Sequence, residues 1–140
     1  MENLALKIKL TVLWLFLAVG YNAYTILDTA RPNVMEGMTL GGAYEGLVVT
    51  EELLIFFTLF WLIPLTMAFL SLTLKDSVNR WANIILSIFY AVIWVIDMIE
   101  GGLLLAQYLI NLSMIVVVAL IVWYAWKWPK QEYKLTLETI

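Results

Sequence analysis

The sequence contains neither cysteine nor histidine. Without cysteine the chain can form no disulfide and has no thiolate nucleophile, and without histidine it lacks the commonest general base near neutral pH. The two absences also exclude the usual zinc sites and haem ligation by histidine or cysteine. A metal site would have to use carboxylates, which favour magnesium, calcium or manganese. We therefore expect neither a metal site nor a cofactor.

Charge is scarce too: charged residues make up 14% of the 140 residues, whereas hydrophobic residues make up 64%. A typical soluble domain is about 45–50% apolar and about 25% charged. A chain of this length has too little interior to hide so much apolar surface, so we expect membrane lipids to surround it. The formal net charge of −3 argues against a nucleic-acid partner. A homo-oligomer or a larger membrane complex remains open.

Four apolar segments are long enough to cross a bilayer, which takes about 20 mostly apolar residues. The first is too long for the apolar part of a signal peptide, and no small-residue cleavage motif directly follows it, so we expect it to be retained. Backbone groups in lipid need internal partners, which predicts four helices. The expected fold is all-α: a transmembrane four-helix bundle, antiparallel and up-down-up-down, in a single domain over residues 1–140. The expected spans are 7–27, 53–74, 81–98 and 103–126.

Lysine and arginine are distributed unevenly between the two sides that these spans define. Only Arg31 lies in the first connection, the outer loop over residues 28–52. Cytoplasmic segments are enriched in lysine and arginine, so we expect both termini in the cytoplasm, including a tail over residues 127–140, and a multi-pass protein of the cell (inner or plasma) membrane. Arg80, in a charged cytoplasmic turn, could bind a lipid phosphate. The other seven basic residues lie on the expected inner side: Lys7, Lys9, Lys75, Arg80, Lys127, Lys130 and Lys134.

The outer loop is long and rich in glycine, and loops of that length are often functional. It is also rather apolar, so it could be a lid over the bundle or a short helix on the outer surface. Three of the spans carry polar or aromatic side chains at steps of three or four residues, a spacing that places them on one helical face. The nine that fall in the outer half are candidate ligand-binding residues: Tyr21, Asn22, Thr25, Asp28, Tyr90, Trp94, Asp97, Gln107 and Asn111.

Two interpretations of this polar set remain open. The side chains could be hydrogen bonds between helices, each worth about 0.6–2 kcal/mol, with Asp28 and Asp97 in contact with water. Alternatively they could converge on an outward-facing polar and aromatic pocket. In such a pocket Asp97 could bind a cation or accept a proton, because polar groups inside spans tend to mark function. No residue is predicted to be catalytic.

Two segments carry a recognisable pattern: LKDSVNRWANII at residues 74–85 and IVWYAWKWP at residues 121–129. With Ile63-Pro64 and FLSL at residues 69–72, they resemble a bacterial family of small, uncharacterised four-span integral membrane proteins. The resemblance covers most of the chain after residue 50. It implies four spans and supplies no activity.

The favoured functional hypothesis is a small membrane protein that binds a lipophilic ligand or a membrane partner, with enzymatic activity the less favoured reading. One alternative is a DoxX-like, quinone-linked redox subunit, although the chain has no cysteine or histidine to relay electrons or protons. The other is a small dimeric proton-coupled transporter, like the small multidrug resistance proteins. Those rely on a carboxylate within the first span, where this chain has no acid before Asp28.

Overall fold

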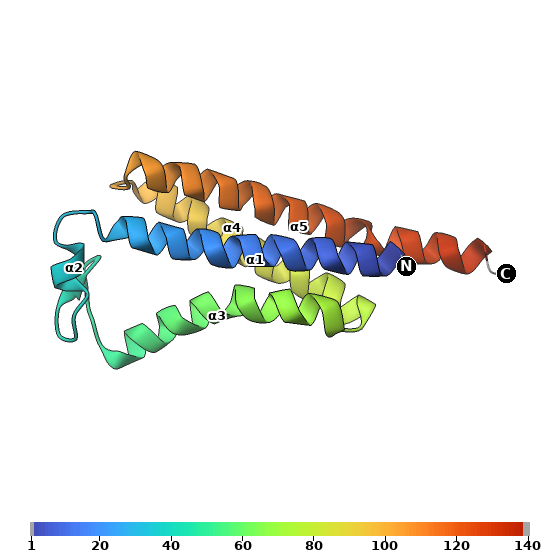
Figure 1. Ribbon diagram of the computed structural model, residues 1–140, viewed down its shortest axis with the longest axis horizontal. Helices are drawn as coiled ribbons and strands as arrows, with labels where there is room; N and C mark the ends of the chain where they lie inside the picture. Colours follow the sequence, from blue (N-terminus) through green and yellow to red (C-terminus); the bar gives the residue numbers. More distant parts are fainter. Residues whose placement is uncertain (1, 139–140) are drawn as a thin grey trace.

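The computed structural model of the chain describes residues 2–138, and the side chains of residues 4–128. Its long elements are four helices, shown in Figure 1: α1 (Glu2–Asp28), α3 (Glu51–Thr73), α4 (Asp76–Glu100) and α5 (Leu105–Glu138). Short elements fill the connection between α1 and α3: α2 (Val34–Gly37), β1 (Ala43–Tyr44) and β2 (Leu47–Val48). The protein is therefore all-helical apart from one small hairpin.

All four long helices are long and apolar enough to cross a membrane. The stretches that meet this criterion are Leu4–Asp28, Glu51–Thr73, Asp76–Glu100 and Leu105–Trp128. Three helices extend well beyond the segments that hydropathy marked, among them α1, which already begins at Glu2. Helix α4 already begins at Asp76, and α5 continues to Glu138 where we expected a tail from residue 127. Hydropathy marks where lipid would end, whereas a helix can continue into water.

Helix α3 begins and bends for local reasons. The Thr50 hydroxyl accepts a hydrogen bond from the Leu53 amide at 3.2 Å, which caps the first turn. Pro64 lies inside the helix, where it lacks the N–H that would continue the backbone ladder. Figure 1 shows α3 bent near its middle, with its first half leaning away from α1. The first half of α3 therefore diverges from α1 toward the end that carries the connecting loop.

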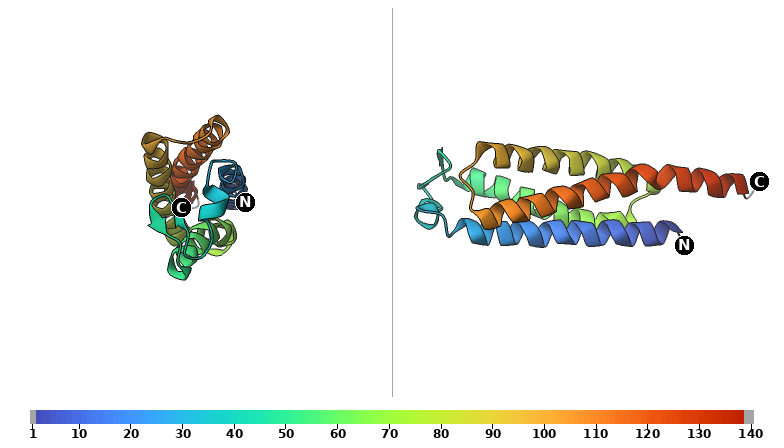
Figure 2. Two further views of the ribbon diagram at one scale, coloured as in Figure 1. Left: turned by 90° about the vertical axis from the view of Figure 1, so that its left-hand side faces the viewer. Right: turned by 90° about the horizontal axis from the view of Figure 1, so that it is seen from above.

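The helices pack in a ring. Helix α1 packs against α3 and α5, α4 packs against α5, and α3 contacts α4 more sparsely. The end-on view in Figure 2 shows α1 and α4 on opposite sides of this ring. Trp14 of α1 is fully buried in the core and reaches across it, donating from Nε1 to the Asn83 Oδ1 of α4 at 2.7 Å.

Buried amides hold the end of the molecule that carries both termini. Asn79 and Asn83 are fully buried, one turn apart on α4. Asn83 donates from Nδ2 to Asn79 Oδ1 at 2.7 Å, and Asn79 donates from Nδ2 to the Ser71 carbonyl of α3 at 2.8 Å. With Trp14 as a further donor, this network joins α1, α3 and α4. The opposite end carries the connecting loop and the turn at Gly101 and Gly102, both of positive φ.

Candidate functional site

The loop between α1 and α3, residues 29–50, is a folded structure. Glu45 and Gly46 have positive φ, as a two-residue hairpin turn between β1 and β2 requires. The Gly41 amide donates to the Val49 carbonyl at 2.9 Å, and the Val49 amide donates to the Gly42 carbonyl at 2.8 Å. Val49 is buried. The loop therefore presents defined side chains to the helices it joins.

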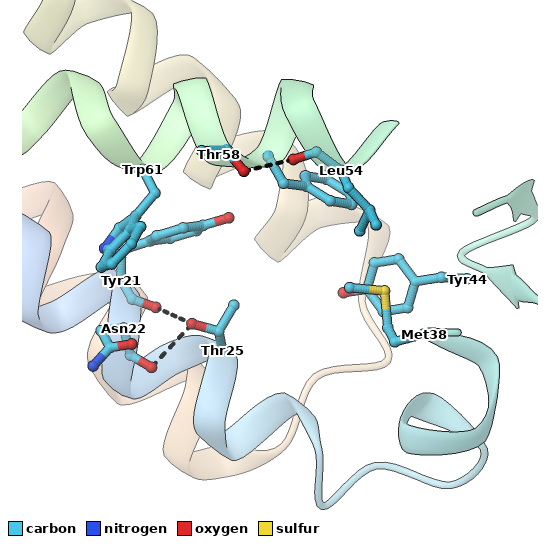
Figure 3. A pocket seen from close by; sticks show the side chains of 9 residues that line it. Tyr21, Asn22, Thr25, Met38, Tyr44, Leu54, Thr58 and Trp61 are labelled. Atoms are coloured by element: carbon cyan, nitrogen blue, oxygen red, sulfur yellow. Dashed lines mark hydrogen bonds between the residues drawn. The ribbon is translucent and has the colours of Figure 1, made fainter. Parts of the chain in front are cut away.

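A cavity of about 320 Å³ lies between α1, the first half of α3 and this loop (Figure 3). In Figure 3, Tyr21 and Trp61 flank one end of the space, and Met38 and Tyr44 flank the other. Its nine lining residues are Tyr21, Asn22 and Thr25 from α1, Leu54, Phe57, Thr58 and Trp61 from α3, and Met38 and Tyr44 from the loop.

The lining of this cavity is aromatic and uncharged. The Thr58 hydroxyl donates to the Leu54 carbonyl at 2.8 Å, and the Thr25 hydroxyl lies within 2.9 Å of the Tyr21 and Asn22 carbonyls. Both hydroxyl oxygens thus keep lone pairs to offer as acceptors. Asn22 is exposed, and among the described side chains its amide has no hydrogen-bond partner. The cavity can therefore offer a few neutral hydrogen-bonding groups beside an apolar surface.

Beside the cavity, Asp28 forms the first of two carboxylate hubs. Its side chain is buried at the last residue of α1. Oδ1 accepts from Arg31 Nη1 at 2.8 Å and from Gln107 Nε2 of α5 at 2.9 Å, and Oδ2 accepts from the Tyr44 hydroxyl at 2.6 Å. A carboxylate at a helix C-terminus faces the negative end of the helix dipole, and Arg31 offsets this cost. The hub joins α1, the loop and α5.

The two loop residues of this hub, Arg31 and Tyr44, both have raised pKa values. The hydrogen bond to Asp28 raises the pKa of Arg31, which also binds Glu45 Oε1 at 2.8 Å. Burial raises the pKa of the Tyr44 hydroxyl, and its hydrogen bond to Asp28 raises it further. Arg31 therefore stays cationic while Tyr44 stays neutral and acts as a donor.

Asp97 of α4 forms the second hub. Its Oδ2 accepts from the Tyr24 hydroxyl of α1 at 2.7 Å and from Asn111 Nδ2 of α5 at 2.9 Å. Within the described part of the chain, no cationic side chain lies within 4.0 Å of Asp97. Asn111 is fully buried, and its Oδ1 has no hydrogen-bond partner there. This hub ties three helices through neutral donors, unlike the Asp28 hub.

The nine candidate residues are thus divided among four surroundings. Tyr21, Asn22 and Thr25 line the cavity, Asp28 and Gln107 share one hub, and Asp97 and Asn111 share the other. Tyr90 and Trp94 are packed in the core, with ring centroids 5.3 Å apart, and the Tyr90 hydroxyl donates to the Phe60 carbonyl. They do not line the cavity.

Several residues that shape this region were not among the candidates. The side of the cavity formed by α3 and the loop was missed because those residues are apolar or lie outside the regular spacing, as with Phe57, Trp61 and Tyr44. Tyr24 and Arg31 were missed as hydrogen-bond donors to the two aspartates. The one available signal was Arg31, the single basic residue on the acidic side that we expected to lie outside.

Comparisons with known proteins do not add an activity. The chain matches no curated protein and no solved structure. A family model described as a family of unknown function, DUF6326, matches residues 3–135, nearly the whole chain. The chain therefore belongs to the uncharacterised family DUF6326.

Proposed function

We propose that the chain is an integral membrane protein, a four-helix bundle of up-down-up-down topology with both termini in the cytoplasm. In each candidate span only 22–33% of the most apolar stretch is buried inside the protein. Large apolar side chains such as Ile55, Ile85 and Leu109 are therefore left on the outer surface, where lipid is their natural neighbour. Seven of the eight lysine and arginine residues lie at the end with the termini, which favours that end as cytoplasmic.

The absence of cysteine makes this topology directly testable. Single cysteines at Thr39 in the outer loop and at Ser77 near the start of α4 would each be the sole thiol of the chain. In intact cells a membrane-impermeant thiol reagent is expected to label Thr39→Cys and to leave Ser77→Cys unlabelled until the cells are opened. Labelling of both, or of Ser77→Cys alone, would contradict the proposed orientation.

We further propose that the cavity between α1, α3 and the outer loop binds an uncharged lipophilic molecule from the outer half of the bilayer. The observation that carries this proposal is the lining: four aromatic rings and a few neutral polar groups, with no charged side chain among the nine described residues that form it. The two nearby carboxylates support the same reading, because Asp28 and Asp97 are both occupied by donors of the chain itself. An anionic ligand would find no cationic side chain in this lining.

The position of the cavity suggests lateral entry. Trp61 lies ten residues into α3, which at 1.5 Å per residue corresponds to about 15 Å, or about half of the hydrocarbon core. Trp61 and Thr58 are exposed on α3, and Asn22 and Thr25 are exposed on α1. A molecule dissolved in the bilayer could therefore enter between the two helices. The volume is at the small end for drug-sized ligands, so it suits a single ring or a chain segment.

Native mass spectrometry of the gently extracted protein tests the proposal. We expect a small neutral molecule to remain bound to the native chain and to be lost from Thr58→Phe, which fills the cavity. Ile55→Phe is the matched control, since residue 55 is lipid-exposed on the same helix and lies outside the cavity. If both variants retained the molecule equally, the cavity would not be its site.

Mass spectrometry together with two activity assays separates the alternatives. A bound quinone that is reduced in a protein-dependent way would favour the redox subunit. Proton-coupled uptake abolished by Asp97→Asn with ligand binding retained would favour the transporter. A co-purifying protein instead of a small molecule would favour a membrane partner.

A further inference from the structure

The end of the molecule with the termini holds an arginine in an unusual setting. The Arg80 guanidinium lies over two indole rings, 5.0 Å from the centroid of Trp81 and 5.3 Å from that of Trp126 on α5. Its Nε donates to the Ala125 carbonyl at 3.3 Å. The Trp126 ring and the Ala125 carbonyl therefore hold this side chain against α5, and the neighbouring Trp81 ring of α4 covers it as well.

These contacts use the faces of the guanidinium and its Nε, and they leave its outer edge unused. Among the side chains of residues 4–128, no carboxylate lies within 4.0 Å of Arg80, and neither Nη atom has a hydrogen-bond acceptor. Asp76, one turn earlier on α4, pairs with Lys7 Nζ at 3.3 Å. A guanidinium edge with two unused N–H groups matches the paired oxygens of a phosphate.

The surroundings of Arg80 favour a lipid as the source of that phosphate. Trp81 is 49% exposed and Trp126 is 55% exposed, so the two rings lie at the outer surface of the helices. The same end carries Lys127 over the Trp123 ring at 4.1 Å and Lys9 over the Tyr124 ring at 5.3 Å. Indole rings and basic side chains gather where a helix passes from hydrocarbon to headgroups. In the proposed orientation this boundary belongs to the cytoplasmic leaflet, which carries anionic lipids.

We propose that Arg80, held by Trp81, Trp126 and the Ala125 carbonyl, binds the phosphate of an anionic lipid in the cytoplasmic leaflet. The site rests on the proposed membrane topology and is independent of the outer cavity. The indole rings would flank the glycerol and upper acyl region while the guanidinium edge takes the phosphate oxygens. Holding the arginine in place beforehand lowers the entropy that binding would otherwise cost.

Native mass spectrometry with added lipid tests this site. The purified full chain in neutral detergent is titrated with phosphatidylglycerol or phosphatidylcholine, and the fraction of lipid-bound protein is counted. We expect tighter binding of phosphatidylglycerol, and we expect Arg80→Gln to weaken it by about tenfold or more, as for hydrogen bonds to charged groups. Lys75→Gln removes one positive charge just before the same helix. It should change binding by less than about twofold, because an exposed lysine without a fixed geometry is screened by salt.

Two further variants show whether the geometry matters beyond charge. Arg80→Lys keeps the charge and loses the planar fork, and Trp126→Leu keeps the arginine and removes one ring. Both are expected to lower the preference for phosphatidylglycerol while the protein still elutes as folded material. Equal losses in Arg80→Gln and Lys75→Gln, or no preference in the native chain, would overturn the proposal. Displacement of the lipid by millimolar inorganic phosphate would also overturn it, since the site would then bind phosphate without the lipid.

The experiments distinguish failure of the Arg80 lipid site from failure of the outer-cavity proposal. Arg80→Gln leaves the cavity residues unchanged, so it should retain any neutral molecule that the native chain carries. Thr58→Phe should keep its preference for phosphatidylglycerol.

Discussion

The Tyr44 hydroxyl donates to Asp28 Oδ2 at 2.6 Å while the Tyr44 ring lines the outer cavity. The same ring meets Phe57 of α3 edge-on, with centroids 6.1 Å apart. One loop residue therefore connects the wall of the cavity to a buried carboxylate at the end of α1. An occupant too large for the cavity would have to displace Tyr44 and break this hydrogen bond.

Tyr44→Phe should make the outer loop open more often without leaving a cavity, because the ring is kept. The substitution keeps the ring and removes one donor to a carboxylate, which costs about 1.5–3 kcal/mol. Because Arg31 and Gln107 still bind Asp28, we expect the loss to act on opening of the loop more than on global unfolding. Hydrogen exchange at the Gly41 and Val49 amides, which bond across the loop, should become about 10–100 times faster.

Tyr124→Phe is the matched control for this prediction. It removes a tyrosine hydroxyl at the other end of the molecule, where among the described residues that hydroxyl makes no hydrogen bond. Loop exchange should be unchanged in this variant. Equal exchange in Tyr44→Phe and the native chain would show that the hydroxyl does not hold the loop.

The raised pKa of Tyr44 predicts how the loop responds to alkali. Burial and the Asp28 hydrogen bond both disfavour the tyrosinate, so the folded pKa lies above the ordinary value of about 10. A raised pKa gives a stability contribution that is complete below about pH 10 and is lost as pH rises through the folded pKa. The difference in tyrosinate absorbance between the native chain and Tyr44→Phe should therefore titrate at higher pH than free tyrosine. A difference curve centred near pH 10 would mean that Tyr44 is in contact with water.

The sequence predicted the helical class because lipid-length apolar runs admit few alternatives. Four stretches of sufficient apolar length are present in the structure, and hydropathy found each of them. Hydropathy could not predict the start of α4 or the end of α5. Charged residues such as Lys75 and Arg80 indicate where a helix would leave the lipid, but the helical hydrogen bonding can continue past that point. Whether those helices cross a bilayer in the expected sense stays a prediction.

Helical spacing grouped the polar residues on single faces of their helices, but it could not predict which residues of different helices would pair. Gln107 and Asp28 are 79 positions apart, and their hydrogen bond depends on how α1 and α5 are rotated. The cavity could not be predicted for another reason. It lies where the first half of α3 leans away from α1, and its lining includes apolar residues such as Leu54. Polarity alone could not mark such a surface.

Removing the buried amide of Asn83 should destabilise the end of the molecule that carries both termini. Asn83→Leu fits in volume but leaves the Trp14 indole N–H and the Asn79 side chain without their partner. The substitution removes two hydrogen bonds between helices, from the Trp14 indole and the Ser71 hydroxyl, and two more to Asn79 within α4. Hydrogen bonds between helices in membranes average about 0.6 kcal/mol, so the variant should lose at least about 1–2 kcal/mol in reversible unfolding from mixed micelles. Asn22→Leu is the control, because the exposed Asn22 amide has no partner among the described side chains. If Asn22→Leu lost as much unfolding free energy as Asn83→Leu, the buried amide network would contribute nothing specific to stability.

The two carboxylate hubs should respond differently to loss of charge. Asp28→Asn removes one of the two carboxylates that pair with Arg31, which is only 18% exposed and keeps Glu45 at 2.8 Å. We therefore expect a loss of unfolding free energy above about 1 kcal/mol but below the about 3–5 kcal/mol that removing the sole partner of a buried charge costs. Asp97→Asn keeps an oxygen that can accept from Tyr24 and Asn111, and no cation loses its partner, so a loss below about 1 kcal/mol is expected. Unfolding of both variants in the same mixed micelles provides the comparison. If Asp97→Asn were the more damaging of the two, the charge on Asp97 would itself be structural, and an unseen cation beside the buried Asn111 Oδ1 would have to be sought.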